Sequence, residues 1–260
     1  MSFRPAMLAL ALCAAASTTA VPVARAQDGA GHVAMGDRDY ASVDVAGSLK
    51  HYEAALAADP KHYEALWKAA RAAVDLGEAE SDAGRRTRLY KDAELYARRA
   101  VEVKPDDAEG HFHLARALGK NALTLGKKER VKYAGDVREQ ALEALKYNPR
   151  HAGALHVMGV WNAEVMRLNG FTRMLARNFL GGKVFGSASW KEAVRYMEQA
   201  VAVDPDRITH RLDLGEIYVD VGNNAKAREQ FEAALRLPAT ELNDKTYKRE
   251  AEAALRRVKG

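Results

Sequence analysis

The chain is short of cysteine and of recognisable catalytic motifs, and each shortage excludes a class of protein. Its single cysteine, Cys13, lies in an N-terminal segment that we expect to be removed, which leaves no disulfide, thiolate metal site or cysteine nucleophile. The sequence has no Walker phosphate-binding loop, no G-x-S-x-G element and no H-E-x-x-H zinc motif. We therefore expect a protein that is not an enzyme and that needs no cofactor.

Proline is also scarce, and histidine is poorly spaced for metal binding. Only seven prolines among 260 residues, with abundant Ala, Lys, Arg and Glu, predict a helical chain. His111 and His113 are two positions apart, so on one helix they point in different directions and cannot chelate one metal together. His151 and His156, five apart, fare little better. We expect an all-α fold without a metal site.

Residues 1–26 carry the three parts of a secretory signal. Arg4 precedes an apolar stretch over 6–16, and a small-residue exit ends at Ala26. The apolar stretch is about half of the ~20 residues needed to span a bilayer, so we expect cleavage before Gln27 and no retained anchor. These features predict a periplasmic or secreted protein.

The remaining chain divides into a short leader and one repeat domain. Polar residues 27–36 are expected to form a flexible leader, and 37–260 the repeat domain. Loss of Arg4 and Arg25 with the signal lowers the formal net charge from +5 to +3. This small surplus is spread along the chain and not clustered, so we expect no nucleic-acid partner.

A short sequence motif that ends in proline recurs along the domain. It consists of a small residue, a branched apolar residue, spacers and proline, in Ala55-Leu56 to Pro60, Ala100-Val101 to Pro105, Ala144-Leu145 to Pro149 and Ala200-Val201 to Pro205. Because proline ends one helix and suits the start of another, each copy of this motif predicts a corner between helices. The expected helices are 38–58, 61–76, 87–103, 106–124, 129–147, 150–167, 170–180, 188–203, 206–221, 224–237 and 242–258.

The helix after each corner repeats its own apolar pattern. After Pro205 it reads Leu214-Gly215 and Tyr218, followed in the partner helix by Ala227 and Phe231, which is the tetratricopeptide pattern. Neither helix of such a pair buries its apolar stripe alone, so stacking creates the core. The fold class is therefore a tetratricopeptide-like solenoid of helical hairpins, with 242–258 as its polar C-terminal capping helix.

The spacing breaks between Pro149 and Pro205, where an extra amphipathic helix is inserted. Its apolar arc carries Phe171, Met174, Leu175 and Phe179, and arginines lie on the opposite side. Three interpretations of residues 168–180 stay open: core packing on the solenoid, a lid over a ligand groove, or contact with a membrane surface.

Around this insertion the sequence resembles the regulator of microtubule dynamics family. The resemblance rests on the run from Leu155 to Trp161, on Ala176-Arg177-Asn178-Phe179-Leu180, on Asp204-Pro205 and on the closing Leu237-Pro238-Ala239-Thr240. It covers about 48–258 and implies a compact tetratricopeptide-like domain. Eukaryotic members are associated with microtubules and organelle contact sites, and the resemblance also implies phospholipid binding as one possible activity.

The inner, concave face of the predicted stack is the place to look for a binding site. Its first helices are expected to present, repeat by repeat, Trp67 with Arg71, Phe112 with Arg116, His156 with Val160, and Leu212. Aromatic faces beside guanidinium groups suit a ligand with an apolar part and an anionic group. The alternative is that Trp67 and Phe112 are ordinary packing between helices and that the arginines are solvated.

Two functions follow from these features. The first is an exported, non-catalytic scaffold that binds a protein or peptide segment in its concave groove. The alternative is a lipid-binding or lipid-transfer protein whose groove or tunnel is covered by residues 168–180, with phospholipid or a membrane surface as partner.

Overall fold

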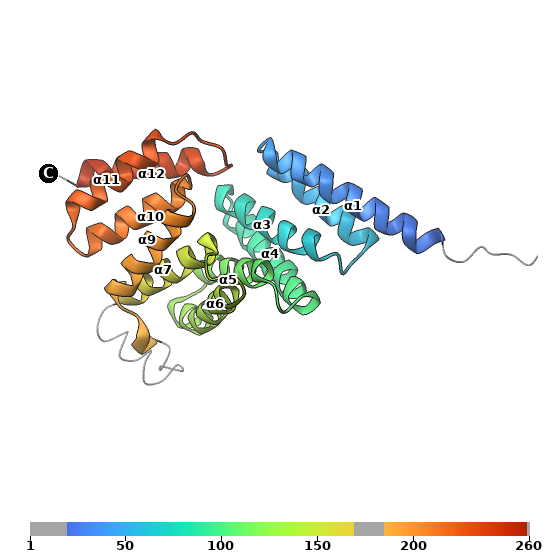
Figure 1. The fold of residues 1–260 in the computed structure, drawn as a ribbon, viewed down its shortest axis with the longest axis horizontal. Helices are drawn as coiled ribbons and strands as arrows, with labels where there is room; N and C mark the ends of the chain where they lie inside the picture. The colour runs from blue at the N-terminus through green and yellow to red at the C-terminus, as the bar shows by residue number, and fades with distance from the viewer. Residues whose placement is uncertain (1–19, 169–184, 259–260) are drawn as a thin grey trace, which may run out of the picture.

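The computed structural model describes residues 20–168 and 185–258, and within these ranges every regular element is a helix (Figure 1). The helices are α1 (Ala20–Ala41), α2 (Val45–Ala58), α3 (Tyr63–Ala79), α4 (Ala83–Val103), α5 (Ala108–Leu123), α6 (Lys127–Tyr147), α7 (Ala152–Arg167), α9 (Trp190–Val203), α10 (Ile208–Asp220), α11 (Asn224–Arg236) and α12 (Asp244–Arg257), with a short 3₁₀ turn η1 (Phe185–Ser187) before α9. None of these helices has the length and apolar character that crossing a membrane requires.

Neighbouring helices pair into hairpins, and the hairpins stack into an arch. The pairs are α1 with α2, α3 with α4, α5 with α6, α7 with α9, and α10 with α11, and α12 follows as a single helix (Figure 1). The first helices of successive hairpins, α3, α5, α7 and α10, contact one another in order. The predicted solenoid of helical hairpins with a C-terminal helix is confirmed.

Each predicted corner is present, but the helix after it begins later than expected. The helix before each corner ends at Asp59 or the matching residue, and the proline lies in the turn that follows. The next helix starts three residues beyond the proline, after a capping residue such as His62, Asp107 or His151 whose side chain accepts from a backbone N–H of the first turn. At these three corners a side-chain cap marks the start of the helix, whereas Arg207, before α10, makes no such bond.

Glycines let the helices of a hairpin approach closely. A Cβ added at Gly215 would lie 2.4 Å from the Phe231 ring, and one added at Gly159 would lie 2.4 Å from Met197. Phe231 and Met197 are fully buried. The small and large positions of the repeat are thus complementary halves of one contact.

The N-terminal part differs from the expectation in two ways. The single helix expected over 38–58 is interrupted at Val43, whose φ of 68° is incompatible with an α-helix. Residues 27–36 do not form an irregular leader but belong to α1. Val33 is buried there and Gly36 lies against the Tyr52 ring, so α1 packs on α2 as the first half of an additional hairpin.

The insertion is only partly within the described ranges. Phe171, Met174, Leu175 and Phe179 lie outside them, so none of the three interpretations is tested. On either side of it, α7 and α9 still pair. Phe185, just after the insertion, is buried and stacks on Trp161 with ring centroids 6.2 Å apart.

The two ends of the arch touch through the connection between α11 and α12. Leu242 packs against the N-terminal apolar cluster, and the Asn243 side-chain amide donates to the Asp75 carbonyl of α3 at 3.0 Å. The Tyr247 hydroxyl of α12 donates to Glu78 at 2.8 Å. These contacts join residues more than 160 positions apart. The C-terminal helix is therefore held back against the third helix, which closes the concave side.

Glu78 is the centre of this closure. Its carboxylate also pairs with Arg116 Nη2 at 3.3 Å and with Lys120 Nζ at 2.6 Å. Burial by itself raises the pKa of Glu78, but Arg116 and Lys120 outweigh it and hold the pKa at about 2. We name this cluster the Glu78 network, consisting of Glu78, Asp75, Arg116, Lys120, Asn243 and Tyr247.

Replacing Glu78 with glutamine is predicted to destabilise the protein by about 3 kcal/mol, because Arg116 and Lys120 lose a buried counter-charge. The folded pKa of about 2 lies below the ordinary 4.5, so this contribution is full above pH 4.5 and is lost as the pH falls toward 2. Chemical denaturation at pH 7 and pH 3 measures both effects.

The matched control is Glu139→Gln on α6, an exposed glutamate that should change stability by less than about 0.5 kcal/mol. An equal effect of the two substitutions at pH 7 would show that the Glu78 network does not stabilise the closed stack.

Candidate functional site

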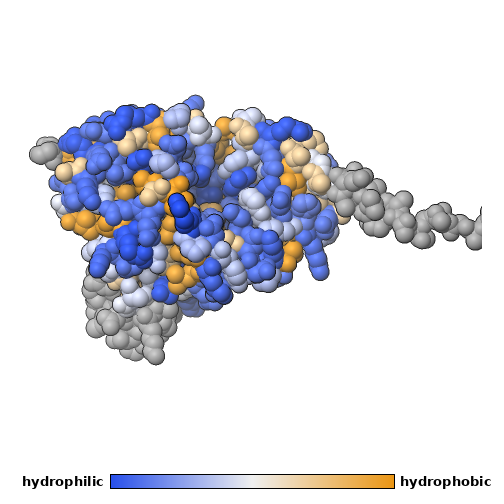
Figure 2. Space-filling model, in the orientation of Figure 1, coloured by the Kyte–Doolittle hydropathy of each residue, from blue (hydrophilic) through white to orange (hydrophobic). Residues whose placement is uncertain are grey.

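The concave face is formed by α3, α5, α7 and α10, the helices that carry the predicted site residues. Figure 2 shows a hollow between the first and the last repeats, with mainly hydrophilic residues around it. The seven predicted positions are distributed along this face and do not converge on one point. Some of these side chains are packed or ion-paired within the fold, and only the remaining ones are free to contact a partner.

The aromatic residues predicted for the groove pack between adjacent inner helices. Trp67 of α3 stacks on His113 of α5, with centroids 5.3 Å apart and planes 8° apart. Phe112 lies 4.5 Å from the His151 ring and fits against Gly153, where an added Cβ would approach to 2.4 Å. Both rings are partly buried and pack between successive repeats.

The two predicted arginines have different surroundings. Arg116 Nη2 lies 2.6 Å from Asp75, and Arg116 belongs to the Glu78 network. Burial opposes its charge, but the neighbouring Asp75 and Glu78 raise its pKa further above the ordinary value. Arg71 forms no ion pair with any residue in the described ranges, and its Cζ lies 3.7 Å from the Tyr40 ring centroid. Arg116 is therefore neutralised within the fold, and Arg71 is not.

On α7 the predicted His156 pairs with Asp213 of α10, a residue that was not predicted. His156 Nε2 lies 2.7 Å from Asp213 Oδ2, and its ring stacks on buried His210 with centroids 4.8 Å apart. Val160 packs against the C-terminal apolar cluster. Among these residues the partly exposed pair His156 and Asp213 remains at the surface.

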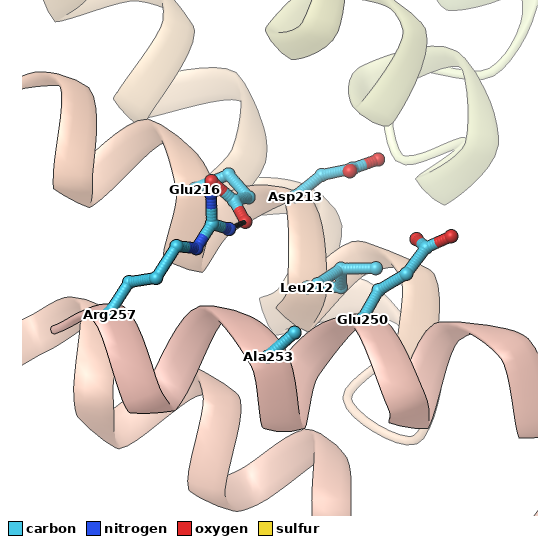
Figure 3. Close-up of a pocket in the computed structure, with 6 residues that line it drawn as sticks. All are labelled: Leu212, Asp213, Glu216, Glu250, Ala253 and Arg257. Carbon is cyan, nitrogen blue, oxygen red and sulfur yellow. Dashed lines mark hydrogen bonds and ion pairs between the residues drawn. The ribbon is translucent and has the colours of Figure 1, made fainter.

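Beside this pair lies a pocket of about 530 Å³ between α10 and α12 (Figure 3). Leu212 and Ala253 line it as apolar side chains. Three carboxylates and one guanidinium complete the lining, from Asp213, Glu216, Glu250 and Arg257. Leu212 was predicted as a groove residue, and it is one of the residues that line this pocket.

The three carboxylates of the pocket outnumber its single guanidinium, so the lining carries a net negative charge. Arg257 Nη2 lies 2.9 Å from Glu216, and Asp213 faces His156, whereas Glu250 has no ion pair in the described chain. Burial, and next the charge of Asp213, raise the pKa of Glu250 above its ordinary value. Both effects disfavour the Glu250 carboxylate, and a cation in the pocket would relieve them.

Of the pocket residues, the sequence analysis named Leu212, and it missed Glu250, Ala253 and Arg257. These residues belong to α12, which the sequence marks only as a polar capping helix. Their spacing of three and four positions puts them on one face, but nothing local shows that this face turns toward α10. Within the described ranges, no group of three or more potential ligands could hold a metal ion.

The arrangement defines a helical-repeat scaffold of the tetratricopeptide type. A thermophilic TPR protein from Thermus thermophilus superposes with a TM-score of 0.63 at 22% sequence identity, over 86% of this chain and 99% of that one. At this identity the match establishes the fold alone.

The profile of the family described as regulator of microtubule dynamics protein 1-3 matches residues 34–259, and the chain belongs to this family. Regulator of microtubule dynamics protein 1 of Mus musculus is 28% identical over 191 residues, 72% of this chain and 62% of the relative. The corresponding protein 3 of Xenopus laevis is 25% identical over 185 residues, 71% of this chain and 40% of that relative. The chain thus matches only part of the length of these relatives.

The contrast between the two arginines gives a stability prediction. Arg116→Gln should cost about 3 kcal/mol, because it leaves Asp75 and Glu78 buried without their main cation. Arg71→Gln should stay within about 1 kcal/mol, since Arg71 stacks on aromatic rings but forms no ion pair among the described residues. Urea denaturation of the two variants and the parent measures the difference, and an equal loss would mean that Arg71 is structural as well.

Proposed function

We propose that the protein is an exported, non-catalytic scaffold that holds a segment of a partner protein against its concave face, with a basic side chain in the pocket between α10 and α12. The observation that carries the proposal is that pocket, where Asp213, Glu216 and Glu250 surround an apolar floor. The tetratricopeptide fold and the family both support a scaffold for protein interaction.

The pocket suits a lysine or arginine side chain for two reasons. Its volume of about 530 Å³ lies within the ~300–1,000 Å³ usual for binding pockets. Leu212 and Ala253 could take the methylene groups, while the ammonium or guanidinium group would meet Glu250 and Asp213. Glu250, which has no cation of its own in the described chain, gains most from such a partner.

A phospholipid is the weaker candidate on the same evidence. An anionic headgroup would be repelled by the carboxylates of this pocket, and the residues proposed as a lid, 168–180, lie almost entirely outside the described ranges. The relatives are named for regulating microtubule dynamics. A chain exported through the signal-like residues 1–26 would not share a compartment with microtubules, so we carry over protein binding alone.

Selection of a randomised library of displayed 12-residue peptides on the purified protein tests this proposal. The selected peptides should share a lysine or arginine, and Glu250→Gln should weaken their binding about tenfold through loss of one charge-assisted contact. Isothermal titration calorimetry of synthetic peptides measures the effect.

Glu229→Gln is the matched control, because Glu229 is an exposed glutamate on α11, away from the pocket. It should leave peptide binding unchanged. Selection of peptides without a basic residue, or equal effects of the two variants, would contradict the assignment of the pocket. Phospholipid that co-purifies and is seen by native mass spectrometry would favour the lipid alternative.

Export is tested by the N-terminus of the mature protein. Expression in a Gram-negative host should yield a periplasmic protein that begins at Gln27, as read by intact mass spectrometry. Replacing both Ala24 and Ala26 with bulky leucine should block cleavage at this site. Recovery of the uncleaved chain in the cytoplasm of the parent strain would contradict export.

A further inference from the structure

Arg71 of α3 has an incomplete set of partners. Its Nε is buried and finds no hydrogen-bond partner among the described residues, and no described carboxylate forms an ion pair with it. The guanidinium stacks on the Tyr40 ring, and the Tyr52 hydroxyl lies beside it. A partly buried cation in this state loses hydration without recovering the loss from a counter-charge.

The carboxylates around Arg71 are already engaged. Asp37 accepts from the Tyr52 hydroxyl at 2.9 Å and from Lys68 Nζ at 2.8 Å. Asp75 accepts from the Tyr40 hydroxyl at 2.6 Å and from Arg116 at 2.6 Å. Asp37 pairs with Lys68 and Asp75 pairs with Arg116, so neither carboxylate neutralises the charge of Arg71.

The guanidinium is nevertheless held in place. Its Cζ lies 3.7 Å from the Tyr40 ring centroid and 5.4 Å from that of Trp67. Trp67 is fixed in turn by stacking on buried His113, whose Nδ1 also finds no partner among the described residues. Stacking uses the face of a guanidinium and leaves its N–H edge for a planar, two-oxygen acceptor.

We propose that Arg71 is an anion-binding position that takes a carboxylate of the bound protein segment, either an acidic side chain or the chain terminus, with Tyr40 and Trp67 orienting the guanidinium. This assignment rests on the proposed function, since it adds a second charged contact to the same concave face. The partner segment would then carry both signs of charge, a basic group for the pocket at Glu250 and an acidic group for Arg71.

Arg71 contributes one unpaired positive charge, which matches a carboxylate because that group is planar and carries one negative charge. Lys68, Arg116 and Lys120, which could add charge for a phosphate dianion, are each paired with a carboxylate. The planar fork of arginine matches the two oxygens of a carboxylate in a bidentate contact.

The first test needs no knowledge of the partner. Sodium propionate, titrated against propionamide at constant ionic strength, should shift the Nε–Hε resonance of Arg71 in a ¹⁵N-labelled sample, and the amide should not. Arg138, which stacks on Trp161 with its Cζ 5.6 Å from the ring, is the matched guanidinium on the outer helix α6 and should not respond. Absence of a propionate-specific shift at Arg71 would overturn the proposal even if peptides bind.

The second test uses the selected peptides. Forms with free carboxylates should bind about tenfold more tightly than forms in which every carboxylate is replaced by an amide, and Arg71→Gln should abolish this preference. Arg71→Lys keeps the charge but loses the fork and should retain part of it, and Arg138→Gln should retain all of it. Circular dichroism confirms that each variant is folded.

The outcomes separate the two proposals. A carboxylate preference that survives Arg71→Gln overturns the role of Arg71 and leaves peptide binding intact. Failure of any peptide to bind, with the propionate response present, overturns the proposed function and leaves an anion site at Arg71. Binding of phosphatidic acid vesicles that depends on Arg71, without a response to propionate, would assign the position to a lipid phosphate instead.

Discussion

The closed form of this repeat stack depends on one buried carboxylate. Repeat proteins are held together by contacts between successive repeats, so nothing in the fold class itself requires the last helix to return to the third. Here Glu78 accepts from Tyr247 of α12 while it pairs with Arg116 and Lys120 of α5. Helices α3, α5 and α12 therefore share one buried charge, and removing it leaves Lys120 without its carboxylate and the Tyr247 hydroxyl without its acceptor.

The same network decides which inner residues are available to a partner. Arg71 and Arg116 occupy equivalent positions in successive repeats, yet Arg116 is neutralised by Asp75 and Glu78, and Arg71 has no ion pair in the described chain. On the opposite side, α12 is brought against α10, which creates the pocket at Glu250. In the closed stack Arg116 is therefore not available to a partner, whereas the pocket at Glu250 is.

Much of this architecture could be predicted from local sequence, because the periodic apolar and small residues report contacts between neighbours in the chain. Gly215 and Phe231 mark one such contact. The closure could not be predicted, since Asn243 and Glu78 are 165 positions apart and each is an ordinary polar residue in its own helix. The extra hairpin of α1 was missed because residues 27–36 are polar and glycine-containing, and their packing on α2 depends on Val33 and Gly36 fitting against a partner helix.

Charge balance along the concave face then argues for a partner with both signs of charge. Most inner ionic groups are paired within the chain, as in Lys68 with Asp37 and Arg207 with Glu241, and such pairs offer little net attraction to a ligand. Among the described residues, the guanidinium of Arg71 and the carboxylate of Glu250 form no ion pair, and their charges are opposite. A partly desolvated charge without a counter-ion costs free energy in the unbound protein, and that cost is recovered only when a complementary group arrives. A segment with an acidic and a basic side chain at matching separation would recover both costs at once, whereas a partner with one sign of charge would recover one and be repelled at the other.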